Sequence, residues 1–304
     1  MSLTLERLQQ LKRQAGVANP PTPASAPTPA SNLDALRRVL RRRAPDAVPP
    51  SSNRAQDRDV PGVELAPGLR LIEARMPMAP EVGPIDGRFD RRDDLHARDL
   101  VFFDTETTGL AGGSGTRAFM VGAADWHDGA LRVRQLLTTT MAGEAAMLDA
   151  FRQWLRPDSV LVSYNGKCYD APLLATRFRL NRMSNPLAGL AHVDLLYPTR
   201  RRYRGRWENC RLATIERHAL GVVREDDLPG SEAPAAWLSY LRGGPARDLR
   251  RVLAHNDRDV VTLAQLLLHL SALAAQDAGI AAAMEPAVPA PLQLHAASRG
   301  LEER

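Results

Sequence analysis

The sequence has few of the residues that mark a disulfide scaffold, a zinc site or a membrane span. Its only cysteines are Cys168 and Cys210, and their spacing suits no metal-ligand pattern, so we expect two reduced thiols. No run of 18 apolar residues occurs, which predicts no transmembrane helix and no membrane partner. The N-terminal MSLTLERLQQLKRQ lacks the basic start and apolar core of a secretory signal. We therefore expect a cytoplasmic protein whose chain starts with a short amphipathic helix.

Lysine is equally scarce, because only Lys12 and Lys167 occur and arginine carries the remaining positive charge. The formal net charge is +5. Residues 1–60 hold ten basic and five acidic side chains, and the rest of the chain holds equal numbers of each. The whole excess of positive charge therefore lies in the N-terminal segment. Heavy use of arginine and alanine can reflect genome composition, so arginine number alone does not indicate a nucleic-acid partner.

Composition divides the chain into three regions. Residues 1–60 are basic and rich in Pro and Ala, and we expect them to be largely disordered because NPPTPASAPTPAS can bury little apolar surface. Within them, LDALRRVLRRR could form a helix that touches nucleic acid or an acidic partner, or could remain a solvated tail. Residues 61–273 carry the periodic patterns of a folded domain. Residues 274–304 are Ala/Pro-rich with a charged end, which predicts a disordered tail.

Hydrophobic periodicity in the central region predicts an α/β fold. LVFFD at 100–104 is a compact apolar run typical of a buried strand. Residues 117–125 and 131–139 suit two more strands, with HDG at 127–129 as their hairpin turn. Further strands are predicted at 160–165 and within 188–196, with one or two short ones within 61–99, and helices at 144–155, 169–180, 210–219, 234–242 and 246–273. This order implies a mixed sheet, a three-stranded antiparallel meander continued by parallel strands, flanked by helices.

Asp104 and Glu106 stand two residues apart at the end of the buried strand predicted at 100–104. Side chains at i and i+2 of a strand project from the same face, so the two carboxylates would repel each other unless a cation lay between them. Oxygen ligands of this kind suit Mg²⁺ or Mn²⁺. The small residues Thr107, Thr108 and Gly109 that follow would let a ligand approach the backbone closely. Alternatively, the pair is an accident at a solvated strand end.

A second segment, YNGKCYD at 164–170, connects a predicted strand to a predicted helix. Asp170 could bind a metal, or it could simply cap the helix, and Asn-Gly is also a common turn. We regard Asn165 and Lys167 as candidates for contact with a phosphate or sugar of the substrate, and Tyr169 as a further candidate substrate contact.

The third segment is HNDRDV at 255–260. His255 and Asp259 are four residues apart, so they share one face of the predicted helix, where the histidine could act as a general base. A surface pair is the alternative interpretation. Asp257 lies on a different face, and we rank it below Asp259.

Outside these segments, RRRYRGRW at 200–207 interleaves arginines with aromatic residues. Arg204 and Trp207 could contact phosphate and stack on unpaired bases, or Trp207 could pack beneath an exposed arginine-rich loop. Asp194 could be a fifth acid near the site, although a structural role such as capping the following helix is favoured.

In this order, FDTETTGL (103–110), YNGKCYD and HNDRDV resemble the DnaQ-like DEDD exonucleases, which have the RNase H-like fold, over residues 100–272. The start of the chain, HVDLLYPTRR (192–201) and CRLATIERHALGVVREDDLPG (210–230) resemble a bacterial YprB-type subgroup. The resemblance implies four acidic metal ligands, Asp104, Glu106, Asp170 and Asp259, with His255 in the general-base position. His255 departs from the pattern because it stands four residues before Asp259, where related enzymes have tyrosine; it could instead orient the water or contact a phosphate.

The resemblance implies a metal-dependent nuclease, most simply a 3′–5′ exonuclease that acts on a single-stranded end with two Mg²⁺ or Mn²⁺ ions. Two ions about 3.5–4 Å apart would activate water and steady the leaving oxygen. The alternatives are a structure-selective endonuclease of the same fold and a non-catalytic nucleic-acid-binding module. The sequence indicates no particular protein partner.

Overall fold

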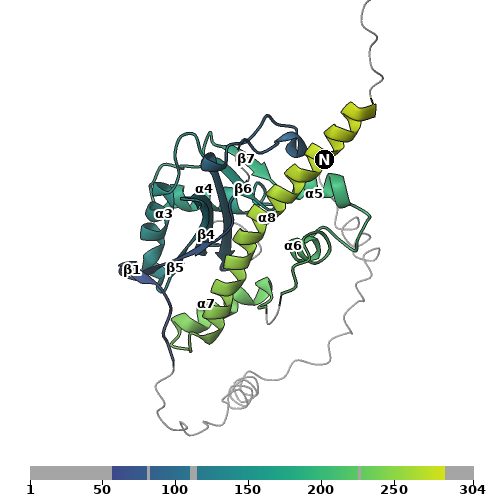
Figure 1. The fold of residues 1–304 in the computed structure, drawn as a ribbon. Coiled ribbons are helices and arrows are strands. Elements are labelled where there is room, and N and C mark those ends of the chain that lie inside the picture. The colour runs from purple at the N-terminus through teal and green to yellow at the C-terminus, as the bar shows by residue number, and fades with distance from the viewer. Residues whose placement is uncertain (1–56, 81–82, 110–114, 225–226, 285–304) are drawn as a thin grey trace, which may run out of the picture. The chain divides into compact units, whose positions relative to one another are not determined.

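The computed structural model describes residues 57–80, 83–109, 115–224 and 227–284. Their centre is a seven-stranded sheet in the order β1-β2-β5-β4-β3-β6-β7 (Figure 1). The pairs β1–β2, β2–β5, β5–β4 and β4–β3 are antiparallel, whereas β3–β6 and β6–β7 are parallel. The predicted meander of β3, β4 and β5, continued by parallel strands, is confirmed. The strands are β1 (Val63–Ala66), β2 (Leu69–Met76), β3 (Leu100–Thr107), β4 (Ala118–His127), β5 (Ala130–Thr138), β6 (Val160–Ser163) and β7 (Ala191–Asp194).

Helices cover both faces of this sheet. They are α3 (Glu144–Gln153), α4 (Asp170–Leu180), α5 (Leu196–Tyr203), α6 (Leu212–Ile215), α7 (Ala233–Leu241) and α8 (Arg247–Met284), with a short π-helix, η4 (Glu216–Leu220), directly after α6. Short 3₁₀ turns lie in the connecting segments: η1 (Arg88–Asp90), η2 (Ala97–Asp99), η3 (Met141–Gly143) and η5 (Gly230–Glu232). The HDG hairpin is confirmed as well, because Asp128 and Gly129 both have positive φ, as a tight two-residue turn requires.

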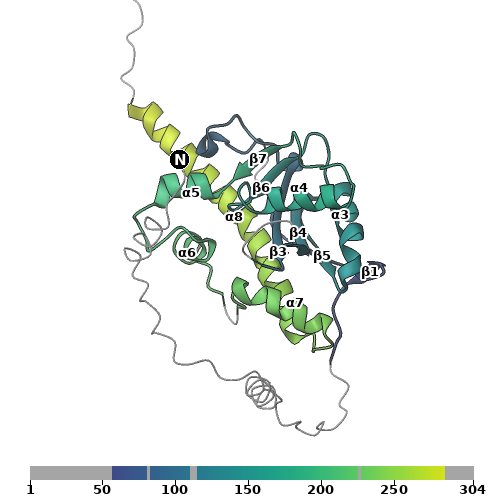
Figure 2. The same cartoon turned by 180° about the vertical axis from the view of Figure 1, so that it is seen from behind.

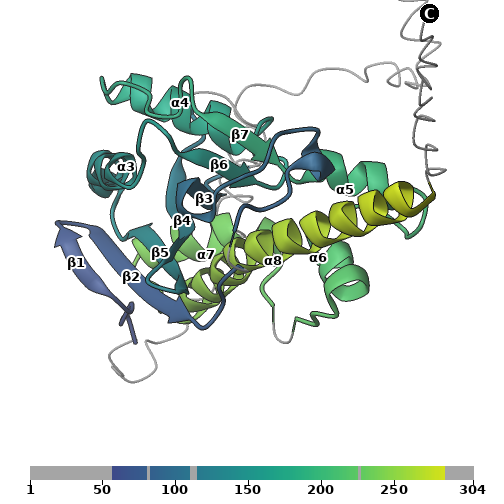
Figure 3. The ribbon, with the colours of Figure 1, turned by 45° about the horizontal axis from the view of Figure 1, so that its top comes forward.

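The alternation of β3 divides the core between its two faces. Val101 and Phe103 belong to a cluster with Phe151 of α3 and Phe178 of α4. Phe102 points to the other face and packs in a cluster with residues of α8. Figures 2 and 3 show α3 and α4 on one side of the sheet and α8 running diagonally across the other. Asp104 and Glu106 continue the Phe102 side of the strand, so they face α8.

Helix α8 continues past the predicted boundary at residue 273 to Met284. The predicted tail at 274–304 therefore starts too early. Residues 272–283 are rich in alanine, the strongest helix former, so the helix continues after its contacts with the sheet end. The predictions for residues 1–56 and 285–304 lie outside the described residues.

Length and composition alone would allow the Arg247–Ile280 part of α8 to cross a membrane. Its apolar side, however, includes Val260, Leu263 and Leu267, which are buried in the cluster that packs against the sheet. A helix in the core of a globular domain has this pattern. The expectation that no segment spans a membrane stays a prediction, and this packing supports it.

Candidate active site

Asp104 and Glu106 lie on β3, an interior strand of the sheet, and face α8. Strand β6 pairs with the first part of β3, Leu100–Phe102, and β4 pairs with Phe102–Thr107, the part that carries the two acids. Glu106 is buried, and Asp104 is half-buried. The strand extends to Thr107 and does not end at the predicted Asp104, so both acids belong to one regular element.

Asn256 of α8 holds the Asp104 carboxylate from the helix side. Its Nδ2 donates to Asp104 Oδ2 at 3.0 Å, and its Oδ1 accepts from Gln135 Nε2 at 3.0 Å. Gln135 Nε2 also donates to the carbonyl of Leu253 at 2.8 Å. These buried polar groups therefore satisfy one another. Asn256 and Gln135 were not predicted as site residues, because nothing in the local sequence pattern connects them to Asp104.

Gly122 makes this approach of helix to sheet possible. It pairs with Asp104 on one side and with Gln135 on the other, so the three residues lie side by side across β3, β4 and β5. A Cβ atom at position 122 would overlap with Asn256 Oδ1. A glycine is therefore required here by close packing against α8.

Asp170 is the first residue of α4 and comes from the opposite side of the site. Thr105 Oγ1 donates to Asp170 Oδ1 in a short hydrogen bond. Burial raises the pKa of Asp170 to about 6, even though the Thr105 hydroxyl acts in the other direction. A carboxylate at a helix N-terminus is electrostatically favourable, so this side chain could serve both the helix and a cation.

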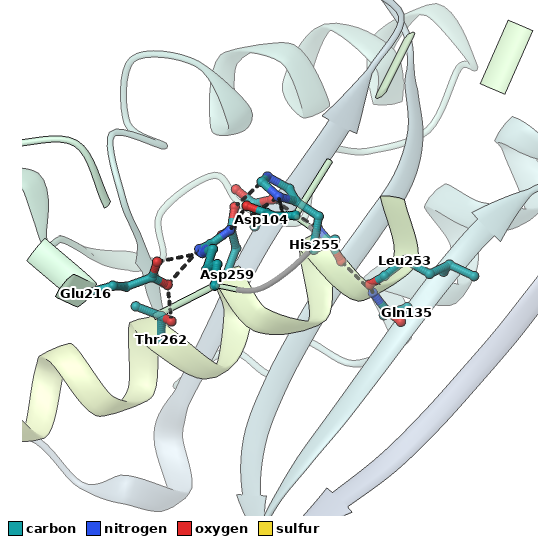
Figure 4. Close-up of polar contacts among 10 residues, drawn as sticks. Asp104, Gln135, Glu216, Leu253, His255, Asp259 and Thr262 are labelled. Carbon is teal, nitrogen blue, oxygen red and sulfur yellow. Dashed lines mark hydrogen bonds and ion pairs between the residues drawn. The ribbon is translucent and has the colours of Figure 1, made fainter. Parts of the chain in front are cut away.

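Asp259 and His255 lie one turn apart on α8, as predicted. His255 Nε2 is 3.5 Å from Asp259 Oδ2. Figure 4 shows Asp104, His255 and Asp259 pointing toward one another from β3 and α8. The charge of Asp259 acts on both Asp104 and Glu106. The choice of Asp259 over Asp257, the lower-ranked alternative, stays a prediction, and the influence of Asp259 on both acids supports it.

A third set of charged residues borders the site: Glu216 is the first residue of η4, and Arg224 and Asp227 lie between η4 and η5. The Arg224 guanidinium donates to both oxygens of Glu216, at 2.6 Å each, and makes a short contact with Asp259. Glu216 also accepts from Thr262 Oγ1 at 2.5 Å. Asp227 Oδ1 is 2.7 Å from His255 Nδ1. The roles of Arg224 and Asp227 were not predicted, since VREDDLPG (223–230) shows no periodicity that would place them at the site, and that of Glu216 was not predicted either.

The acids of this cluster raise one another's pKa. Burial and the charges of Asp170, Asp259 and Glu106 raise the pKa of Asp104 well above its ordinary value. Burial and the charges of Asp259, Asp170 and Asp227 do the same for Glu106. Burial also raises the pKa of Asp259, although His255 and Arg224 oppose it. Buried carboxylates that repel one another in this way form a site of strongly negative potential, which a cation would stabilise.

The chemistry of this donor set fits a divalent cation. Asp104, Glu106, Asp170 and Asp259 offer only oxygen, which is the ligand type of Mg²⁺ and Mn²⁺. Within the described residues, no three Asp, Glu, His or Cys side chains already stand as a ready-formed metal-binding group. Thr105 and Arg224 occupy one oxygen each of Asp170 and Asp259. A metal ion could therefore bind through the other oxygen of each of these two carboxylates.

A cavity of about 380 Å³ opens beside Asp170. It contains three of the predicted substrate contacts, Thr107, Gly109 and Tyr169, and the Tyr169 side chain is exposed. Thr108 lies differently, because its backbone and its Oγ1 both bond to the backbone of Arg117 across the strand ends. Its hydrogen bonds therefore join β3 to β4.

Asp194 organises the loop that leads into α4. It is buried and accepts the backbone amides of Asn165 at 2.6 Å, Lys167 at 3.1 Å and Leu196 at 3.1 Å. The favoured structural role of Asp194 agrees with these bonds, since Leu196 begins the helix that follows. Asn165 adopts a left-handed conformation with φ of 66°. The loop is thus shaped by its backbone, and Lys167 is exposed beside it.

Trp207 is enclosed by other rings. Tyr203 stacks on it at a centroid distance of 4.7 Å, and His218 stacks on it at 5.1 Å. Arg206 also lies near the ring, at 5.7 Å, while Arg204 is exposed. Trp207 therefore packs inside the loop, which favours the alternative interpretation of this motif over stacking on bases.

Comparison with known proteins gives the site a family context. A family model described as the RNase H superfamily matches residues 101–271, more than half of the chain. The protein YprB of Bacillus subtilis (strain 168) is 38% identical over 173 residues, which span 57% of this chain and 42% of that relative. The chain thus aligns with less than half the length of this relative.

Among solved structures, a family B DNA polymerase from Pyrobaculum calidifontis aligns with a TM-score of 0.44 and 14% identity over 57% of this chain and 27% of the polymerase chain. A product-bound exonuclease I aligns with a TM-score of 0.35 and 17% identity over 51% and 46% of the two chains. The family model covers β3, α4 and most of α8, and so includes every one of the four clustered acids. The chain belongs to the RNase H superfamily.

Proposed function

We propose that this protein is a metal-dependent nuclease of the DEDD type that hydrolyses phosphodiester bonds, removing nucleotides from the 3′ end of a nucleic-acid strand. The observation that carries the proposal is the convergence of Asp104, Glu106, Asp170 and Asp259 from three separate elements, with His255 at the rim. A fold has no structural need for four mutually repelling acids in one place.

The residues have separate tasks in the proposed reaction. The four carboxylates would hold two divalent ions, Mg²⁺ or Mn²⁺. Such ions, when bound, supply positive charge that makes water a better nucleophile and offsets the charge that develops on the phosphate. Asn256 holds the orientation of Asp104 through its hydrogen bond at 3.0 Å. His255 accepts the proton of the attacking water at Nε2, the ring nitrogen that faces Asp259.

The cavity beside Asp170 supports action at a strand end. Its volume of about 380 Å³ suits one nucleotide rather than a duplex. Thr105, Thr107 and Thr116 line it with hydroxyls, and Leu173 lines it with apolar surface. Tyr169 lies at its exposed edge and offers a ring against which a terminal base could stack. These features favour a single-stranded end as the substrate.

The test is a nuclease assay with Mn²⁺ on single-stranded DNA, duplex DNA and RNA. A 5′-labelled strand should shorten stepwise, and Asp104→Asn should lower the rate by at least about 10³-fold, since a metal ligand is lost without a change in shape. The matched control is Asp257→Asn on the same helix, which should keep the wild-type rate.

Two results would contradict the proposal. If Asp104→Asn and wild type cleave alike, the observed activity does not come from this site. If wild type binds Mn²⁺ and a strand but cleaves neither DNA nor RNA, the chain is a binding module. Internal cuts in place of a ladder would identify the endonuclease alternative and overturn the exonuclease assignment alone.

A further inference from the structure

His255 makes different contacts at its two ring nitrogens. Nδ1 lies 2.7 Å from Asp227 Oδ1, and Nε2 lies 3.5 Å from Asp259 Oδ2. The side chains of His255 and Asp227 are only 15% and 27% exposed. The shorter contact is therefore a partly buried hydrogen bond, made by the ring nitrogen other than the one that faces Asp259.

We propose that Asp227 is a positioning residue that fixes the tautomer and orientation of His255. This inference rests on the proposed nuclease function. An ionised carboxylate can only accept a hydrogen bond, so Nδ1 must carry the proton at this contact. A neutral imidazole has one ring proton, so Nε2 is then left as the free acceptor and faces the acids. Without Asp227, the proton could reside on either nitrogen.

Arg224 holds Asp227 in this orientation. Its Nη1 is 3.2 Å from Asp227 Oδ2, while its Nε and Nη2 are bound to Glu216 at 2.6 Å each. Glu216 thus fixes the guanidinium through Nε and Nη2, and the remaining nitrogen, Nη1, donates to the second oxygen of Asp227. Arg224 Nη1 also lies 3.2 Å from His255 Nδ1. Two donors cannot bond each other, and the shorter Asp227 contact decides that Nδ1 is protonated.

The spacing of His255 in the sequence gains a physical reason from this arrangement. A histidine four residues before Asp259 lies on the same helix face, one turn away. A second hydrogen bond, at Nδ1, is therefore needed to fix the orientation of the ring and of Nε2. Asp227 supplies that hydrogen bond from a segment outside the helix.

In the reaction, Nε2 takes a proton from water as the new oxygen–phosphorus bond forms. The bond from phosphorus to the leaving 3′ oxygen breaks, and that oxygen takes a proton from solvent.

The kinetic test compares Asp227→Ala, Asp227→Glu, His255→Ala and the double variant Asp227→Ala/His255→Ala. We expect Asp227→Ala to lower kcat by about 10- to 100-fold with KM within about twofold, since a well-placed base contributes about 10²–10⁴-fold. Asp227→Glu should recover part of the loss. The double variant should match His255→Ala, because Asp227 acts only through the histidine. Losses that multiply, or an Asp227→Ala variant with wild-type kcat, would overturn the proposal.

A second measurement does not depend on activity. Long-range ¹H–¹⁵N spectra of histidine-labelled protein report which ring nitrogen is protonated, and His255→Gln assigns the signal. We expect the Nδ1-protonated form in wild type and in the control Asp257→Ala, and a mixture of tautomers in Asp227→Ala. An Nε2-protonated ring in wild type would refute the role of Asp227. Absence of cleavage by wild type would refute the nuclease function but leave the tautomer result standing.

Discussion

The pair Arg224–Glu216 provides the sharpest test of how this site is built. Both partners are deeply buried, with side chains 8% and 1% exposed, and they share two hydrogen bonds of 2.6 Å. Replacing Arg224 by methionine keeps the length and apolar stem of the side chain but removes the charge. Glu216 then keeps Thr262 as a donor while losing both bonds to the guanidinium.

The expected cost follows from this burial. Removing one partner of a buried ion pair leaves the other charge uncompensated and costs about 3–5 kcal/mol of unfolding free energy. For a domain of this size, each kcal/mol lowers Tm by about 2–4 °C, so Arg224→Met should lower Tm by about 6–20 °C. The double variant Arg224→Met/Glu216→Leu should recover part of the loss, since it removes the uncompensated Glu216 charge, while Asp227 and Asp259 still lack the guanidinium.

Urea denaturation followed by circular dichroism measures the unfolding free energy of each variant, and thermal denaturation measures its Tm. The matched control is Arg152→Met on α3, which breaks a surface pair with Asp149 whose side chains are 47% and 40% exposed. Water screens that pair, so the control should stay within about 0.5 kcal/mol of wild type. An Arg224→Met variant as stable as this control would refute the description of Arg224 as the buried cation that holds the acid cluster together. A double variant less stable than the single one would also contradict it.

Three further predictions concern the acids, the packing and the substrate. Burial and neighbouring charge raise the pKa of Asp104, so its ionisation destabilises the fold, and the free energy of unfolding falls as the pH rises through that pKa. In EDTA, Asp104→Asn should therefore be more stable than wild type at pH 8 but not at pH 4, as measured by urea denaturation. Gly122→Ala should cost about 1–3 kcal/mol and weaken stabilisation by Mn²⁺ in thermal melts, because the new methyl group displaces Asn256; an unchanged Tm would contradict this. Arg204→Ala should reduce the slope of log binding constant against log salt concentration for strand binding by about one. Trp207→Ala should chiefly lower Tm. The reverse pattern would support stacking of Trp207 on bases.

Local patterns in the sequence were sufficient to place most of the candidate site. The apolar run before Asp104 predicts a buried strand, and strand alternation puts Glu106 on the same face. Helical spacing likewise puts His255 above Asp259. These inferences hold because they depend on backbone geometry over a few residues, which tertiary structure rarely changes. Local patterns were less reliable for the end of α8, where composition suggested a tail although alanine sustains the helix to Met284.

The interpretation of Trp207 shows why composition is weaker evidence than periodicity. Arginines interleaved with aromatic residues are typical of a surface that stacks on bases. Here, Tyr203 and His218 cover the Trp207 ring. Whether an aromatic ring is available to a ligand depends on what packs against it, and the sequence around it does not report that.

The sequence by itself predicted the order of most elements, although not the helix α5, and it predicted the helix face that carries His255. The full set of four acids followed from the family resemblance. Only the tertiary structure decided how these groups are held. Asn256 reaches Asp104 across 152 positions of the chain, and Asp227 reaches His255 from a segment without regular periodicity. Arg224 enters the cluster from the same segment and binds Glu216 and Asp259 at once. Such contacts depend on the packing of distant segments, because hydrogen bonds and charges act over a few ångströms in space whatever the separation in sequence.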